Sequence, residues 1–281
     1  MIIARTVSDV RRAVKAWRKE GLTVGLVPTM GYLHEGHASL VQAAKASCDR
    51  VVVSVFVNPT QFGPNEDLES YPRDFEHDCA LLEDLGTDLV FHPEPTELYF
   101  PDASTWVEVP SLAQNLCAKT RPTHFRGVCT VVSKLFHIAA PDKAFFGQKD
   151  AQQLAVIRRM VRDLNFDLEI VGCPIVREAD GLAKSSRNTY LNPKERQAAL
   201  VLNHSLKKAY SLIEAGETDT NKLLAVIKEC IAAEPLAKLD YAEAVDADSM
   251  KPLAAVTGNV LFAIAVYIGK TRLIDNFLVS R

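Results

Sequence analysis

One run of seven residues restricts the fold more than any other feature of this chain. Residues 51–57 read Val-Val-Val-Ser-Val-Phe-Val, so apolar side chains follow one another without the alternation of a half-exposed strand. A strand of this composition is covered on both faces, which is typical of a parallel sheet flanked by helices. The run therefore predicts an α/β domain rather than an all-β or all-helical one.

Strand-like and helical stretches alternate on both sides of this run. The other strand-like stretches are residues 22–27, 88–91, 143–146 and 168–176. The helical patterns are residues 8–20, 38–46, 73–85, 128–138 and 150–163. This order predicts βαβ units and a doubly wound parallel sheet, whose ligands bind at the carboxyl ends of the strands. The loops after residues 27, 57, 146 and 176 are then expected to line one crevice.

The pattern changes near residue 176. Two helical stretches, 193–215 and 219–233, are followed by two strand-like stretches, 241–245 and 260–268. Helices followed by strands predict a second, smaller α+β domain. We expect the first domain to span residues 1–175 and the second residues 176–281. Gly269-Lys270-Thr271 resembles the tail of a phosphate-binding loop, but it lacks the first glycine of that motif and is interpreted as a turn.

Composition excludes several classes of function. The 281 residues carry a net charge of −3, which gives no electrostatic basis for binding nucleic acid or an anionic membrane. The longest apolar run, residues 260–268, is too short to span a bilayer, and the first residues do not resemble a signal peptide. The six cysteines form no Cys-x-x-Cys pair and are interpreted as reduced core thiols. We expect a cytoplasmic protein.

A histidine-rich turn carries the strongest functional signal. Residues 28–37 read Pro-Thr-Met-Gly-Tyr-Leu-His-Glu-Gly-His, between a predicted strand and a predicted helix. A helix start offers free N–H groups and a positive dipole end, which suit a phosphate. His34 and His37 are three residues apart and lie on one side of the first helical turn. Two alternatives stay open, namely a solvated or capping histidine pair and half of a zinc site.

Polar residues follow two other predicted strands. Asn58 and Gln61 come directly after residues 51–57, and a neutral glutamine suits a hydroxy acid, although a simple Pro-Gly turn with Asn58 at the strand end is equally compatible. Lys149 follows residues 143–146, where a lysine can meet a phosphate, and Asp150 can cap the next helix.

Three further positions are candidates. The loop of residues 180–188 combines two cations, two hydroxyl groups and a glycine, and is either a mobile lid over a triphosphate or a solvated loop between domains. Arg126 adds a cation beside Gly127. Asp78 is a weak candidate for a metal ligand, since a carboxylate on a helix is more often a surface charge.

Five motifs in this order resemble the pantoate–β-alanine ligase (pantothenate synthetase) family. They are PTMGYLHEGH, FVNPTQFG with EDLESYPRD, HFRGVCTVVSKLF, FGQKDAQQL and DGLAKSSRN, and the resemblance runs nearly end to end. It implies a Rossmann-like N-terminal domain, a smaller C-terminal lid domain and a homodimer. It also implies an activity in which ATP, accompanied by Mg²⁺, converts pantoate into pantoyl adenylate with release of pyrophosphate. β-Alanine then displaces AMP to give pantothenate.

The resemblance also implies roles for individual residues. The residues that would hold ATP are Met30, Gly31, Tyr32, Leu33, His34, Glu35, Gly36, His37, Gly147, Gln148, Lys149, Asp150, Val176, Lys184, Ser185, Ser186 and Arg187. Those assigned to catalysis are His37, as proton donor, His34, Lys149, Ser185, Ser186 and Arg187. Those expected to contact pantoate or β-alanine are Gln61, Gln153, Asn58 and Arg126. Lys184 departs from the family, which commonly has Leu or Met there, so it either adds a cation near the triphosphate or points into solvent.

Three other functions remain compatible with the histidine turn. A nucleotidyltransferase acting on a phosphorylated acceptor is disfavoured by the neutral glutamines. An aminoacyl-tRNA synthetase is disfavoured by the short, acidic chain. A regulatory module that binds ATP without turning it over is the non-enzymatic alternative.

Overall fold

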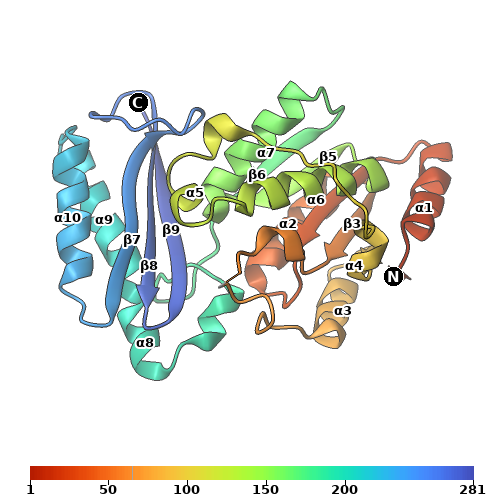
Figure 1. Ribbon diagram of the computed structural model, residues 1–281, viewed down its shortest axis with the longest axis horizontal. Coiled ribbons are helices and arrows are strands. Elements are labelled where there is room, and N and C mark those ends of the chain that lie inside the picture. Colours follow the sequence, from red (N-terminus) through yellow and green to blue (C-terminus); the bar gives the residue numbers. More distant parts are fainter. Residues whose placement is uncertain (65) are drawn as a thin grey trace. The chain divides into compact units, whose positions relative to one another are not determined.

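The larger sheet is parallel throughout, as the apolar run of residues 51–57 and the alternation of strands and helices predict. The computed structural model describes residues 1–64 and 66–281 (Figure 1). The six strands are β1 (Ile2–Ala4), β2 (Val24–Thr29), β3 (Arg50–Val55), β4 (Leu89–Phe91), β5 (Lys143–Gly147) and β6 (Glu169–Cys173). They are ordered β1-β4-β3-β2-β5-β6, and every neighbouring pair is parallel. The predicted α/β class is confirmed.

Helices connect these strands and cover the sheet. They are α1 (Val7–Lys19), α2 (Glu35–Ser47), α3 (Phe75–Asp84), α4 (Pro95–Leu98), α6 (His124–Ala139) and α7 (Ala151–Asp163). Val51, Val53 and Val55 of β3 enter one core with Leu40 of α2 and Leu82 of α3, all of them buried. Alternate side chains of a strand share a face, so this core covers one side of β3. On α6, 13 of 16 residues are buried, so this helix is surrounded by protein rather than lying at the surface.

Strand order places a topological switch point beside β2. The chain moves outward from β2 to β3 and β4, and then returns to the other side of β2 with β5. Loops that leave β2 and β5 in opposite directions open a crevice at the carboxyl ends of these strands. The histidine turn follows β2, Asn58 and Gln61 follow β3, and Gly147 ends β5. The fourth predicted loop follows β6, which lies parallel beside β5 and ends at Cys173, so all four predicted loops start from adjacent strands at the carboxyl-terminal end of the sheet.

A second, antiparallel sheet has its own core. It consists of β7 (Ala237–Asp246), β8 (Asn259–Ile268) and β9 (Thr271–Ser280), in that order. The helices before it are α8 (Pro193–Ala198), α9 (Leu200–Glu214) and α10 (Thr220–Ala232), and Figure 1 shows α9 and α10 beside this sheet. Ile213 of α9 and Ile227 of α10 pack with Phe262 and Ile264 of β8. The smaller α+β part is confirmed.

The described residues group into two compact units. The first comprises residues 1–110, 121–148 and 156–174, and the second comprises residues 111–120, 149–155 and 175–281. The second unit thus includes α5 (Cys117–Thr120) and the first turn of α7. The predicted boundary between residues 175 and 176 stays a prediction, because packing shows which segments lie together and not which of them fold alone.

Several elements differ from the sequence-based prediction. The stretch 193–215 is two helices that meet at Ala199, and the strand expected to reach residue 176 ends at Cys173. β1 and β9 were not predicted, because β1 is short and β9 carries polar residues at positions where an apolar run was required. The turn predicted at Gly269 is confirmed, with φ +57° between β8 and β9. Short 3₁₀ turns occur at Pro59–Gln61, Pro110–Leu112, Gln148–Asp150 and Ser186–Tyr190.

Candidate active site

His34 and His37 form the N-terminal cap of α2. His34 is the N-cap residue, and its Nδ1 accepts a hydrogen bond of 3.0 Å from the main-chain N–H of Gly36. Nδ1 of His37 accepts one of 3.3 Å from the N–H of His34, and the ring centroids are 4.1 Å apart. The structure therefore confirms that the two histidines cap the helix. Both of these hydrogen bonds use Nδ1 of the ring.

The caps fix the tautomer of both rings. A neutral imidazole has one N–H and one acceptor nitrogen, and here Nδ1 is the acceptor in both residues. The proton of each neutral ring is then on Nε2. The start of α2 consequently presents two ring N–H donors together with the positive end of the helix dipole, which is an arrangement suited to phosphate oxygens.

Asp78 supports the histidine turn through hydrogen bonds to its main chain. Its carboxylate accepts hydrogen bonds from the N–H of Tyr32 (2.9 Å) and of Leu33 (2.6 Å). Only 1% of Asp78 is exposed, so the interpretation of a surface charge is wrong. Burial raises the pKa of this carboxyl above its usual value, while the two N–H donors oppose the rise. The residue acts on the turn through the main chain.

The turn itself has an unusual backbone. Gly31 has φ +84° and Tyr32 has φ +52°, so two consecutive residues lie in the left-handed region. A Cβ on Gly31 would also come within 3.0 Å of Asp78 and of Val55. Only glycine combines this dihedral angle with so close an approach. The carboxylate of Asp78 therefore supplies the acceptor for two N–H groups of this turn.

The role of Asp78 as a metal ligand stays a prediction, and its carboxylate is engaged with the main chain of the turn. Both of its oxygens already accept main-chain hydrogen bonds. Within residues 1–64 and 66–281, no group of three or more His, Cys, Asp or Glu residues is arranged to hold a metal ion. Among these described residues, no observation supports Asp78 as a metal ligand or the two histidines as half of a zinc site.

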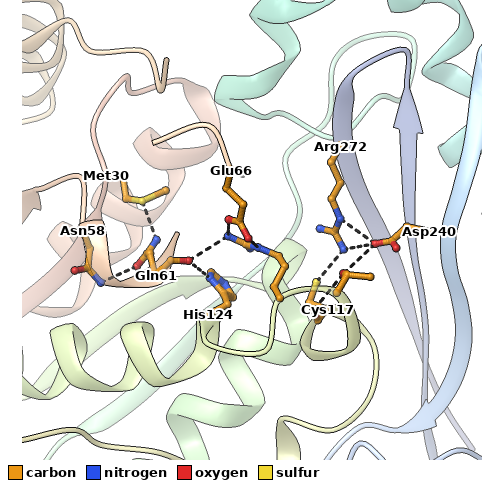
Figure 2. A network of polar contacts seen from close by, with 10 residues as sticks. Met30, Asn58, Gln61, Glu66, Cys117, His124, Asp240 and Arg272 are labelled. Atoms are coloured by element: carbon orange, nitrogen blue, oxygen red, sulfur yellow. Dashed lines mark hydrogen bonds and ion pairs between the residues drawn. The ribbon is translucent and has the colours of Figure 1, made fainter. Parts of the chain in front are cut away.

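Gln61 is held by contacts on both its side chain and its main chain (Figure 2). Its amide nitrogen donates to Sδ of Met30 (2.8 Å), and its amide oxygen accepts from Nδ2 of Asn58 (3.2 Å). Asn58 is 1% exposed and also donates to the carbonyl of Gly127 (3.2 Å). The simple turn considered for Asn58 is therefore incomplete, because the side chain connects Gln61 to α6.

The N-terminus of α6 holds the carbonyl of Gln61. Nδ1 of His124 lies 2.9 Å from this oxygen, and because a carbonyl only accepts, Nδ1 of His124 carries the proton. Arg121 also donates to it (3.4 Å) and pairs with Glu66 (Figure 2). A Cβ on Gly127 would collide with the main chain of Thr60 and Gln61. These residues position the loop that carries Gln61, a role that the sequence did not predict for them.

Arg126, a predicted substrate contact, lies beside an acidic and an aromatic residue. Its guanidinium lies 3.5 Å from a carboxylate oxygen of Glu108 and 4.8 Å from the ring centre of Trp106. In the motif of residues 124–127 it is His124 and Gly127, rather than Arg126, that contact the Gln61 loop.

Position 147 is open, and the residues after it differ in exposure. A Cβ on Gly147 would find nothing within 4 Å, so this position at the end of β5 is not packed against other residues. Gln148 and Asp150 are exposed. Lys149 belongs to the second unit, where its ammonium donates to the carbonyl of Lys184 (3.0 Å). Burial of the ammonium, and secondarily the charge of Arg187, lowers the pKa of Lys149 below its usual value.

The loop that carries Ser185, Ser186 and Arg187 folds back on itself. The N–H of Lys184 donates to the carbonyl of Val176 (2.9 Å), and residues 177 and 183 form an isolated antiparallel bridge. Ser185 caps a short 3₁₀ turn by accepting from the N–H of Arg187. Nζ of Lys184 lies 3.0 Å from a carboxylate oxygen of Glu178. Lys184 thus joins the two arms of the loop, and with a side chain only 19% exposed it does not point freely into solvent.

The two glutamines at the start of α7 have different roles. Gln152 is buried and bonds to main-chain groups of Leu112, Asn115 and Cys117. Gln153, the predicted substrate contact, is partly exposed on the same helix. Its accessibility is compatible with a ligand contact, whereas the polar atoms of Gln152 are occupied by the protein.

Fold and site together define an α/β protein with an HxGH turn at the switch point of its parallel sheet. A family model described as pantoate-beta-alanine ligase matches residues 2–278. A pantothenate synthetase of Clostridium acetobutylicum is 57% identical over 277 residues, covering 99% of either chain, and one of Enterococcus faecalis is 58% identical, covering 99% of this chain and 98% of that protein. This chain belongs to the pantoate–β-alanine ligase family.

Solved structures agree with this assignment. A crystal structure of pantothenate synthetase from Thermus thermophilus is 44% identical, covers 99% of either chain and superposes with a TM-score of 0.93. A pantoate-beta-alanine ligase from Francisella tularensis, complexed with beta-gamma ATP and beta-alanine, is 35% identical and has a TM-score of 0.79, covering 99% of this chain and 97% of that one. In the described part of this chain, no helix is both long and apolar enough to cross a membrane.

Proposed function

We propose that this enzyme joins pantoate to β-alanine in two half-reactions driven by ATP. In the first, a carboxylate oxygen of pantoate attacks the α-phosphorus, the bond from that phosphorus to the β-phosphate oxygen breaks, and pyrophosphate leaves. In the second, the amine of β-alanine attacks the acyl carbon of pantoyl adenylate, AMP leaves and a proton is released. Family membership supports this reaction, and the Francisella relative complexed with ATP and β-alanine supports the choice of substrates.

The observation that carries the proposal is the cap of α2. His34 and His37 use Nδ1 to bind the main chain, so each neutral ring offers Nε2–H as a donor. In adenylate formation, negative charge grows on the departing pyrophosphate. Donors that are already oriented stabilise such charge without reorganising. We assign both histidines to these phosphate oxygens, with His37 as the proton donor.

Other phosphate contacts come from the second unit. Lys149, Ser185, Ser186 and Arg187 are cationic or hydroxyl-bearing groups, and we assign them to the charge of the triphosphate and of the leaving pyrophosphate. The remaining proposed ATP contacts are Met30, Gly31, Tyr32, Leu33, Glu35, Gly36, Gly147, Gln148, Asp150 and Val176, together with Lys184 through its main chain.

The hydroxy acid is assigned to the glutamines. Gln61 is buried, neutral and held from both sides, which suits hydroxyl and carboxylate groups that must be oriented rather than neutralised. Gln153 is the second proposed contact. Asn58 and Arg126 are proposed to act in substrate binding as well, Asn58 through its bond to Gln61.

Three further properties belong to this proposal. Mg²⁺ is taken as part of the substrate, MgATP, with ligands mainly from the phosphates and water. A cytoplasmic location is supported by six free thiols. A homodimer is supported by the family resemblance, and sedimentation equilibrium tests it.

Isotope exchange between ATP and pyrophosphate tests the proposed function directly. The purified enzyme is expected to exchange labelled pyrophosphate into ATP only when pantoate is present, and to release AMP only when β-alanine is added as well. Exchange that requires a phosphorylated acceptor and ignores pantoate would show a nucleotidyltransferase instead. ATP binding without AMP release in the presence of both substrates would show a regulatory module.

A further inference from the structure

Two polar residues interrupt the last strand of the chain. β9 reads Thr-Arg-Leu-Ile-Asp-Asn-Phe-Leu-Val-Ser, and Asp275 and Asn276 are 2% and 6% exposed. Buried polar groups are costly unless they are hydrogen-bonded. The strand lies at the edge of the smaller sheet, and nothing in its apolar core requires a carboxylate and an amide at these positions. Their hydrogen-bond partners show which segments of the chain these two side chains hold in place.

Asn276 holds Lys149. Its Nδ2 donates a hydrogen bond of 2.8 Å to the main-chain carbonyl of Lys149, 127 residues earlier in the chain. Asn276 also receives support from its neighbour, because its own N–H donates to Oδ1 of Asp275 (2.8 Å). The amide therefore fixes the backbone from which the Lys149 side chain extends.

Asp275 holds the loop of residues 176–188. Arg177 donates to both of its oxygens, at 2.7 Å and 2.9 Å, which is the two-pronged geometry that makes arginine–carboxylate pairs specific. The same guanidinium donates to the carbonyl of Gly181 (3.1 Å). Asp275 thus fixes both the first arm of the loop and its tip through a single arginine.

These contacts close a ring. The ammonium of Lys149 donates to the carbonyl of Lys184, which lies in the other arm of the loop that Arg177 anchors. Starting at Asn276, the ring passes through Lys149, the loop and Arg177, and returns to Asp275. Neighbouring residues of a strand point to opposite faces, so one dipeptide can hold two different segments. All members of the ring lie in the second unit.

We infer that Asp275 and Asn276 are positioning residues for ATP activation, which hold Lys149 and the loop of Ser185–Arg187 in one fixed frame. This inference rests on the phosphate roles proposed above for Lys149 and that loop. It predicts that the last strand contributes to the first half-reaction only, because pantoyl adenylate keeps the α-phosphate but has lost the β- and γ-phosphates, which leave as the pyrophosphate to which these groups are assigned.

The test separates the two half-reactions. Asn276→Ala is expected to lower kcat/KM for ATP in pantoate-dependent exchange about tenfold, the equivalent of one lost hydrogen bond. Formation of pantothenate from supplied pantoyl adenylate and β-alanine is expected to stay within about twofold of the wild type. Asp275→Asn is expected to lower the exchange further, because it breaks the paired contact with Arg177. Ser280→Ala, on an exposed position of the same strand, serves as the matched control.

A purely structural role gives a different result. If Asn276→Ala lowers both half-reactions by the same factor, in step with a fall in thermal stability, the positioning role is wrong. It is equally wrong if exchange is unchanged. This inference can fail while the proposed function stands, because the function is judged by exchange in the wild-type enzyme.

A double variant tests whether Asn276 acts through Lys149. If Asn276 acts through Lys149, adding Asn276→Ala to Lys149→Ala is expected to change the residual exchange by less than about twofold. Independent, multiplying effects of the two substitutions would contradict the inference. Because Asn276→Ala removes one hydrogen bond and no charge, it also provides a readout if Asp275→Asn does not fold.

Discussion

The two segments proposed to contact phosphate are held in place by different means. The histidine turn is bound by its own caps and by one buried carboxylate, so main-chain N–H groups carry nearly all the restraint. The loop of residues 176–188 is bound by side-chain ion pairs, one of them to a strand about a hundred residues further on. The first arrangement fixes a backbone shape, whereas the second fixes a loop to a neighbouring element. We therefore expect substitutions in the turn to lower both the exchange activity and the free energy of unfolding. Substitutions in the loop are expected to lower the exchange activity more than the free energy of unfolding.

The largest effect is expected for His37→Ala. The variant loses an oriented donor to the growing charge, which is worth about 3–4 kcal/mol in a transition state, so pantoate-dependent exchange is expected to fall by two to three orders of magnitude. It also loses a cap of α2, which lowers the free energy of unfolding by about 1 kcal/mol. His204→Ala, at an exposed position, is the control. A His37→Ala enzyme with full exchange activity would refute the assignment of this residue.

Asp78→Ala removes the carboxylate that supports the histidine turn. It tests whether activity and stability change together when this turn is disturbed. The buried N–H of Leu33 and the partly buried N–H of Tyr32 lose their acceptor, at about 1–3 kcal/mol for the buried one and less for the other. We expect both a lower unfolding free energy and a higher KM for ATP, although Asp78 is assigned no contact with ATP. Glu76→Ala, which is exposed on the same helix, is expected to change neither. Chemical denaturation and exchange kinetics measure the two effects, and a stability loss with unchanged ATP kinetics would contradict a positioning role.

The turn and its helix could be predicted, but their support could not. Strand, glycine turn and helix follow one another locally, so residues 28–37 carry their own signal. Asp78 lies 45 residues beyond Leu33, and a single carboxylate in a helical pattern cannot be distinguished from a surface charge. β9 was missed for a related reason. Asp275 and Asn276 break the apolar pattern that identifies a strand, and they do so because they hold other segments.

A pH profile tests Lys149 in the loop. Its folded pKa is lowered by burial, so between that pKa and the ordinary value of 10.5 the native protein binds fewer protons than the unfolded chain. Its contribution to stability therefore rises with pH in this window. Loss of its positive charge is expected to weaken ATP binding, so exchange is expected to decline on the alkaline side below pH 10.5.

The exchange reaction suits this measurement because it does not involve the amine of β-alanine. Lys149→Arg keeps its charge throughout the window and is expected to lose the alkaline decline, even if its maximal rate is lower. An unchanged decline in Lys149→Arg would assign the titration to another group.

The smallest effect is expected for Lys184→Leu, which restores a residue common in the family. Lys184 pairs with Glu178 within the loop, and the two side chains are 19% and 29% exposed. A partly exposed pair of this kind contributes at most about 1 kcal/mol, whereas the contact that matters to Lys149 is the main-chain carbonyl of Lys184, which leucine retains. Exchange is therefore expected to stay within about twofold at low and at high salt. A tenfold loss that grows as salt is lowered would instead indicate that the Lys184 ammonium acts on the triphosphate. The side chains of this loop would then contribute to the reaction as well as to the shape of the loop.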